Sequence, residues 1–308
     1  DSKWLADLLR HGLVKKSFIP PKEVRQWRDL TTLRKNFTRT LGDEKRRVHK
    51  LFETANIKIS SVVTDLFGVT GRNLMEILCK KKKTITIEDI AKCAKGSLRS
   101  KAEELLRSIQ GFFEDHHRFQ LKMLLKAIAL YEKQIESVTA RLSKLMQPHK
   151  ELLDRLDEVY GINKVAAQSV ISHLGTTLEE FPSEHALASW CGLCPGNNES
   201  AGKRKSGRSP VSNHPFKTIM VEIAWSAIRK NGSYYKEKYY RLKTRRGAKR
   251  AIVAVAHSIL KGLYHIIKFG ESFMDIGDGH LEEKRQAAKL YRLKKEAKKM
   301  GLELVPSA

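Results

Sequence analysis

The apolar residues of this chain recur mostly three or four positions apart, which is the spacing of one face of an α-helix. A short helix is expected over residues 3–13, followed by an extended connector at Pro20 and Pro21. A long and largely polar helix is expected from about Glu23 to Ala55, and another over residues 60–78. The pattern therefore predicts a mainly α protein.

The most regular pattern is a heptad seam, which is typical of a coiled coil. A similar apolar stripe precedes it from Leu98 to Phe119, so we expect long helices that join copies of the chain into a dimer or tetramer. An ordinary helix that buries the same stripe within one chain is the alternative. The seam consists of Leu121, Leu124, Ile128, Tyr131, Ile135, Val138, Leu142 and Leu145.

Residues 152–174 read as two helices joined by a tight turn, and they resemble a helix-hairpin-helix element. In that element a glycine-containing turn and a helix N-terminus present backbone N–H groups to a phosphate. Asn163 stands where a second glycine is usual, and asparagine tolerates left-handed backbone geometry better than most residues. Gly161, Asn163 and Lys164 are therefore candidate contacts to nucleic acid.

The net charge of the chain indicates which class of partner it binds. The 308 residues include 59 lysines and arginines against 34 acidic residues, a formal charge of +25. Such an excess attracts polyanions, because cations that neutralise phosphates release bound counterions. The most apolar run, residues 252–269, is interrupted by His257, Lys261, His265 and Lys268, so we expect no membrane span. Four cysteines do not make a disulfide framework, which favours the cytoplasm.

Residues 186–208 break the helical texture, because they are rich in glycine, asparagine and serine before becoming basic. Ser200 is expected in a flexible turn with Gly202. A serine that attacks a phosphodiester needs access, nearby cations and a proton acceptor. The cations are Lys203, Arg204, Lys205 and Arg208. The sequence shows no acceptor, and a phosphate-binding loop without chemistry would have the same composition.

The basic residues are concentrated near this loop. Residues 201–250 hold 15 lysines and arginines against two glutamates. Arg245, Arg246 and Lys249 are candidate contacts to nucleic acid at the end of this region. The interleaved tyrosines either stack on unpaired bases or pack inside the protein. These are Tyr234, Tyr235, Tyr239 and Tyr240.

Other patterns of metal-binding residue types are weaker. Cys191 and Cys194 have the spacing of half a zinc site, but no pair of histidines completes a tetrahedral set. His116 and His117 lie on the heptad stripe, where a pair on one helix face is expected. His257 and His265 lie in an apolar helix, which favours a place in the core or in an interface.

Four segments together resemble the bridge-RNA-guided insertion-sequence transposases, relatives of the Piv-type DNA invertases. They are DSKWLADLLRHGLVKKSFIPP at 1–21, the hairpin at 152–174, LASWCGLCPGNNESAGKRKSGR at 187–208 and RRGAKRAIVAVAHSIL at 245–260. The resemblance implies the end of a RuvC-like domain at 1–22, a helical linker region at 23–95, a coiled coil at 96–150, a transposase domain at 151–275 and a basic C-terminal helix at 276–308.

The resemblance also implies a mechanism. Ser200 corresponds to the nucleophile that forms a 5′-phosphoserine intermediate, although residues 209–216 depart from the family's more basic stretch. Asp1 corresponds to the fourth residue of an Asp-Glu-Asp-Asp set that binds Mg²⁺, so we expect an upstream segment with the other three. One carboxylate does not hold such an ion alone.

The expected partners are donor DNA, target DNA and a structured guide RNA, in the nucleoid-associated cytoplasm of a bacterium or archaeon. Two alternatives remain open. The first is a Piv-like invertase that uses the same residues without a guide RNA. The second is a scaffold that binds nucleic acid without cutting it.

Overall fold

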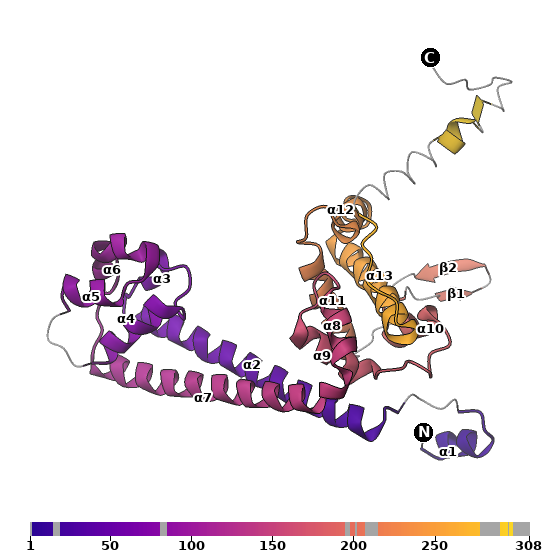
Figure 1. The fold of residues 1–308 in the computed structure, drawn as a ribbon, viewed down its shortest axis with the longest axis horizontal. Coiled ribbons are helices and arrows are strands. Elements are labelled where there is room, and N and C mark those ends of the chain that lie inside the picture. The colour runs from indigo at the N-terminus through magenta and orange to yellow at the C-terminus, as the bar shows by residue number, and fades with distance from the viewer. Residues whose placement is uncertain are drawn as a thin grey trace. The chain divides into compact units, whose positions relative to one another are not determined.

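The computed structural model describes residues 2–14, 19–80, 85–194, 198–200, 202–206, 215–277, 290–294 and 296–297. Helices make up most of these residues, so the prediction of a mainly α fold is confirmed (Figure 1). The strands within them are β1 (Asn198–Ser200) and β2 (Lys203–Ser206), which pair antiparallel.

The helices follow one another along the chain as Figure 1 labels them. The α-helices are α1 (Ser2–Arg10), α2 (Lys22–Thr54), α3 (Ile59–Val62), α4 (Val69–Cys79), α5 (Ile87–Cys93), α6 (Ala102–Ser108), α7 (Asp115–Leu145), α8 (Lys150–Asp157), α9 (Lys164–Leu174), α10 (Glu184–Trp190), α11 (Pro215–Ala227), α12 (Tyr234–Arg246) and α13 (Ala248–Phe269). Short 3₁₀ helices cover Gly96–Lys101 and Gln147–His149.

The chain divides into two compact units. The inserted unit is Thr32–Arg141, and the main unit is Asp1–Thr31 together with Leu142–Ala308. The division falls within α2 and α7. The predicted helical linker at 23–95 and the predicted coiled coil at 96–150 both contribute to the inserted unit.

The inserted unit is built on an antiparallel pair formed by α2 and α7. The ring of Phe37 lies 6.1 Å from that of Tyr131, and the ring of Phe52 lies 6.4 Å from that of Phe113, so the two helices run in opposite directions. The helices α3 to α6 add buried residues to the same core. Burial of this continuous apolar surface is the main stabilising contribution to the unit.

The apolar residues of the α7 heptad seam pack against other parts of the same chain. Leu121 and Ile128 are fully buried in the core of the inserted unit. Tyr131, Ile135 and Val138 are half-buried. This burial favours the alternative of a helix that packs its stripe within one chain. Self-association therefore stays a prediction, and any contact between copies needs another surface.

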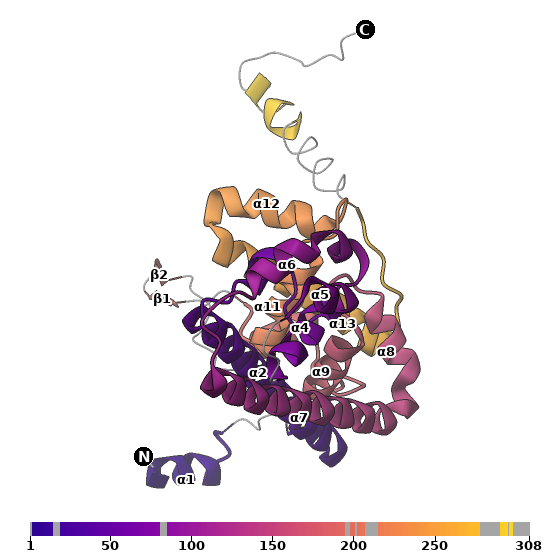
Figure 2. The same cartoon turned by 90° about the vertical axis from the view of Figure 1, so that its left-hand side faces the viewer.

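The main unit is organised around α13, whose core positions include Val255, Ile259 and Leu263. This helix packs against α8, α10, α11 and α12. Figure 2 labels α8, α11, α12 and α13 in a view turned by 90° from that of Figure 1. Among the described residues, α13 is the one helix long and apolar enough to cross a membrane. Half of its most apolar stretch is buried against other helices, and core helices of folded domains pass the same test of length and composition.

Few of the described residues at the two ends of the chain are buried. The helix α1 has no buried residue and exposes Trp4, Leu5 and Leu9. Residues 290–294 and 296–297 are helical, within the segment where a basic C-terminal helix is predicted. The rest of that segment, beyond residue 277, lies outside the described residues.

Candidate nucleic-acid interface

Gly161 lies in the turn between α8 and α9, and its position has a packing reason. Its φ is +87°, in the region that favours glycine. A Cβ atom there would lie 2.4 Å from the carbonyl oxygen of Ile223 and 2.6 Å from the backbone nitrogen of Ala227. The turn is therefore pressed against the backbone of α11. Close packing within the main unit explains this glycine without a phosphate contact.

Asn163 is the N-cap of α9. Its φ and ψ are −110° and 175°, so the expectation of a left-handed asparagine is wrong, and Gly161 is the left-handed residue of the turn. The Asn163 side-chain oxygen accepts a hydrogen bond from the backbone N–H of Ala166 at 2.9 Å. Asn163 and Lys164 are both exposed, so the first turn of α9 is open to a phosphate.

Replacing Asn163 with alanine should destabilise the main unit by about 1 kcal/mol, because the cap of α9 is lost. Urea unfolding followed by circular dichroism measures this change. Asn163→Asp is the matched control, since aspartate caps a helix equally well and should unfold near the parent midpoint. Equal midpoints for the alanine variant and the parent would show that the cap contributes nothing.

Ser200 is the last residue of β1, beside the turn rather than in it. Its backbone pairs with Lys203, and Glu199 pairs with Arg204. Gly202 connects the strands with φ +71°. Ser200 and the basic run 203–205 are therefore brought together by a short antiparallel hairpin. The side chains of these strand residues lie outside the described residues, as do Asp1 and Arg208 altogether.

The polar face of α13 holds a cluster that sequence spacing does not indicate. Glu184 of α10 accepts from Lys261 Nζ at 2.6 Å and lies 3.3 Å from His265 Nε2. Burial acts to raise the pKa of Glu184, but the hydrogen bonds of Lys261 and His265 and the charges of Lys261 and His185 outweigh it and lower that pKa. About 80 residues of sequence separate the partners, so no local pattern reveals them.

His257 lies on the same face of α13, half-buried, with its Nε2 atom 4.0 Å from Cys194 Sγ. Burial lowers the pKa of His257, and the charges of Lys261 and Lys238 lower it further. Cys191 is buried, which raises its pKa well above the ordinary thiol value. A thiol that stays protonated is a poor metal ligand and a poor nucleophile.

The tyrosines of α12 divide between packing and exposure. Tyr235 and Tyr239 are buried, and burial is the main reason why the pKa of Tyr235 is raised. Tyr240 is 52% exposed, with Lys243 Nζ 5.7 Å from its ring centroid. The two interpretations of the tyrosines thus apply to different residues. Tyr240 has the exposed ring and adjacent cation that a base-stacking position needs.

The end of α12 and the start of α13 form a cationic surface. Arg245 and Arg246 lie in the last turn of α12, Gly247 breaks the helix with φ +80°, and Lys249 lies in the first turn of α13. All three cations are exposed, and none forms an ion pair with a carboxylate in the described part of the chain. We call Arg245, Arg246 and Lys249 the α12–α13 cationic surface. Unpaired exposed cations are suited to phosphate contacts.

Comparison with known proteins gives one family match, which covers the two hairpins and ends before the α12–α13 cationic surface. Residues 153–241 match the family model described as the transposase IS116/IS110/IS902 family. The match begins within α8, includes the α8–α9 hairpin and the β1–β2 hairpin, and ends within α12. No curated protein matches the chain.

Proposed function

We propose that this chain works as an insertion-sequence transposase or recombinase that cuts and rejoins DNA, with Ser200 as its nucleophile. The observation that carries the proposal is the transposase match over residues 153–241, which supports an insertion-sequence transposase and contains Ser200. DNA is the partner that a transposase implies. The β1–β2 register, which sets Ser200 opposite Lys203, is compatible with a serine that meets a phosphate among cations.

In the proposed reaction the Ser200 Oγ atom attacks the scissile phosphorus. A serine–phosphate ester forms at the 5′ end of one DNA segment, and the bond from phosphorus to the 3′ oxygen of the other segment breaks. The proton lost by the Ser200 hydroxyl ends on the departing oxygen, which becomes a 3′-hydroxyl. Attack of a different 3′-hydroxyl on the same ester reverses these bonds and joins new ends. The cations of the basic run 203–205 would offset the phosphoryl charge.

The Mg²⁺ implied by the resemblance does not fit the described residues. Their one cluster of three candidate ligands, Glu114 with His116 and His117, is rich in nitrogen, whereas Mg²⁺ prefers oxygen. Asp1 is one carboxylate and needs partners. We therefore propose that further carboxylates come from a RuvC-like domain. The exposed apolar residues Trp4, Leu5 and Leu9 of α1 support a domain contact there.

Neutralising the α12–α13 cationic surface should weaken DNA binding. With Arg245, Arg246 and Lys249 replaced by alanine, the slope of log affinity against log salt should fall in magnitude by about 2 to 3, since roughly one unit is lost per phosphate contact. Fluorescence anisotropy with a labelled duplex at several salt concentrations measures the slope.

The matched control removes the same number and type of charges elsewhere. Arg99, Lys101 and Arg107 are exposed residues of the inserted unit. Their triple alanine variant should keep the parent slope. If both triple variants lowered the slope equally, DNA binding would depend on total charge and the α12–α13 cationic surface would have no special role.

A structured guide RNA distinguishes this proposal from a Piv-like invertase. The proposal rests on the four-segment resemblance, and the charge of +25 is compatible with binding both RNA and DNA. Purified full-length protein should retain a discrete RNA that ribonuclease removes. Recombination that proceeds equally well after the RNA has been digested would favour the invertase instead.

We also propose that copies of the chain associate through the outer face of α7. Phe119, Met123 and Leu130 are 63%, 42% and 54% exposed there. Phe119 and Met123 line a shallow hollow of about 420 Å³ together with Leu51 and Thr54 of α2. An exposed apolar strip of this kind is typical of a protein interface.

The double variant Met123→Lys, Leu130→Lys should shift the chain from dimer or tetramer to monomer, because buried charge opposes association. Light scattering coupled to size exclusion measures the mass. Val69 and Ile87 are exposed apolar residues of α4 and α5, and their double lysine variant is the control. Retention of the parent mass by the α7 variant would exclude this face as the interface.

A further inference from the structure

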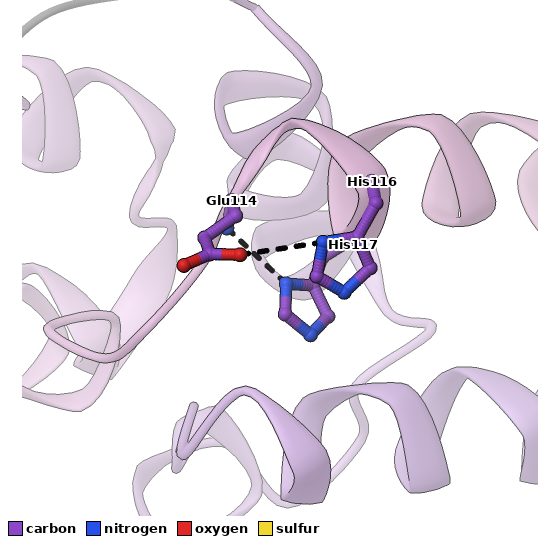
Figure 3. Close-up of side chains that lie close together, drawn as sticks. All are labelled: Glu114, His116 and His117. Atoms are coloured by element: carbon purple, nitrogen blue, oxygen red, sulfur yellow. Dashed lines mark hydrogen bonds and ion pairs between the residues drawn. The ribbon is translucent and has the colours of Figure 1, made fainter.

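Three side chains at the start of α7 converge on one small volume (Figure 3). Glu114 precedes the helix, and His116 and His117 lie in its first turn. One ligand atom of each lies within 4.8 Å of the others. The Glu114 Oε2 atom is 3.4 Å from His116 Nδ1, and the two imidazole centroids are 3.7 Å apart. The sequence by itself predicts only a pair on one helix face.

A hydrogen bond occupies one of the three ligand atoms. The backbone N–H of Glu114 donates to His117 Nδ1 at 3.2 Å. This bond uses the Nδ1 lone pair that a metal ion also needs. An ion that binds at Nδ1 therefore takes the place of the Glu114 N–H. Figure 3 shows that Nδ1 of both rings faces Glu114.

The spacing agrees with the geometry of a small divalent ion. Ligands at about 2.1 Å in a tetrahedral zinc site are about 3.4 Å from one another. The Glu114–His116 separation has this value already. Glu114 and His116 are exposed, so small rotations of their side chains bring the third ligand atom into range. Their exposure also leaves a fourth position open to water.

The surroundings hold the third ligand in place. His117 is buried and stacks on Phe113, with ring centroids 5.8 Å apart. Just before it, the N–H of Phe112 donates to the carbonyl oxygen of Ala55 at 2.8 Å. Arg118 donates to the carbonyl oxygen of Leu78 and to Asp115, and its guanidinium lies over the Phe113 ring, 5.6 Å from the centroid. A fixed ligand loses little entropy when an ion binds.

We propose that Glu114, His116 and His117 bind a divalent transition-metal ion of the zinc class, with water as the fourth ligand. Two imidazole nitrogens and one carboxylate suit Zn²⁺, Co²⁺, Ni²⁺ or Cu²⁺ and do not suit Mg²⁺. The site lies in the inserted unit and is separate from the metal set expected around Asp1. Its role is to tie the loop before α7 to the first turn of that helix.

Titration with Co²⁺ tests the proposal directly, on full-length protein without a histidine tag. We expect one Co²⁺ per chain, the visible absorption of a four-coordinate ion, and displacement by Zn²⁺ but not by excess Mg²⁺. His116→Ala and Glu114→Gln should each lower the affinity at least tenfold. Because both residues are exposed, neither change should alter the circular dichroism spectrum.

His49→Ala is the matched control, because it removes an exposed histidine from the same unit. It should bind Co²⁺ as the parent does. The proposal is overturned if the parent shows no four-coordinate absorption, if His116→Ala binds as tightly as the parent, or if His49→Ala loses the ion equally. Loss of the ion from His117→Ala would count in favour only if its unfolding midpoint without metal matches the parent.

Discussion

Replacing Ser200 with alanine should abolish the covalent protein–DNA adduct and reduce recombination by at least about a thousandfold, as loss of a nucleophile does in other enzymes. The physical reason is that alanine has no oxygen with which to form the ester that conserves the energy of the cut strand. The measurement uses full-length protein with 5′-labelled and internally labelled DNA, and adducts are separated on a denaturing gel.

Ser206 supplies the matched control for this experiment. It lies in β2 of the same hairpin, where its backbone pairs with Asn198, so Ser206→Ala makes the same chemical change without touching the proposed nucleophile. This variant should form the adduct at the parent rate. Adduct formation by Ser200→Ala would assign the nucleophile to another residue. Absence of any adduct from a parent that recombines DNA would favour a mechanism without a covalent intermediate. A parent that binds DNA but neither cuts nor rejoins it would favour the scaffold.

Replacing Gly161 with alanine should destabilise the main unit by about 3 kcal/mol or more. A left-handed backbone costs an alanine about 1–2 kcal/mol, and overpacking adds about 1–3 kcal/mol. The neighbouring atoms are the backbone carbonyl of Ile223 at 2.4 Å and the backbone nitrogen of Ala227 at 2.6 Å, which cannot rotate away as a side chain can. Urea unfolding measures the difference in free energy.

Gly270 serves as the control that separates the cost of the left-handed backbone from the cost of overpacking. It is also left-handed, with φ +69°, but the nearest atom to an added Cβ is the end of the Arg155 side chain at 3.0 Å. Because that end can move, Gly270→Ala should cost only about 1 kcal/mol, from the backbone alone. If both variants lost equal stability, close packing against α11 would not be the reason for a glycine at position 161. That result would favour the alternative explanation, a contact between this turn and a phosphate.

The sequence could predict the candidate site only where the residues concerned are close together along the chain. The expectation that residues 186–208 break the helical texture is wrong for their first part, because Glu184–Trp190 form α10 and Leu187, Ala188, Cys191 and Leu193 are buried. The role of Ser200 is implied by the resemblance and stays a prediction. The Glu184–Lys261–His265 cluster was not predicted, because its members are on different helices. The division of the α12 tyrosines was not predictable either, since burial of Tyr239 depends on which face of α12 meets its neighbours.

The sequence by itself determined that this protein is mainly helical, basic and divided by breaks near prolines and glycines, because helical periodicity and net charge are properties of neighbouring residues. Only the tertiary structure decided which apolar residues are buried within the chain. It buries Leu121 and Ile128 in a core to which α2 also contributes, and it packs the turn at Gly161 against the backbone of α11. These outcomes depend on the packing of distant segments, which periodicity does not encode.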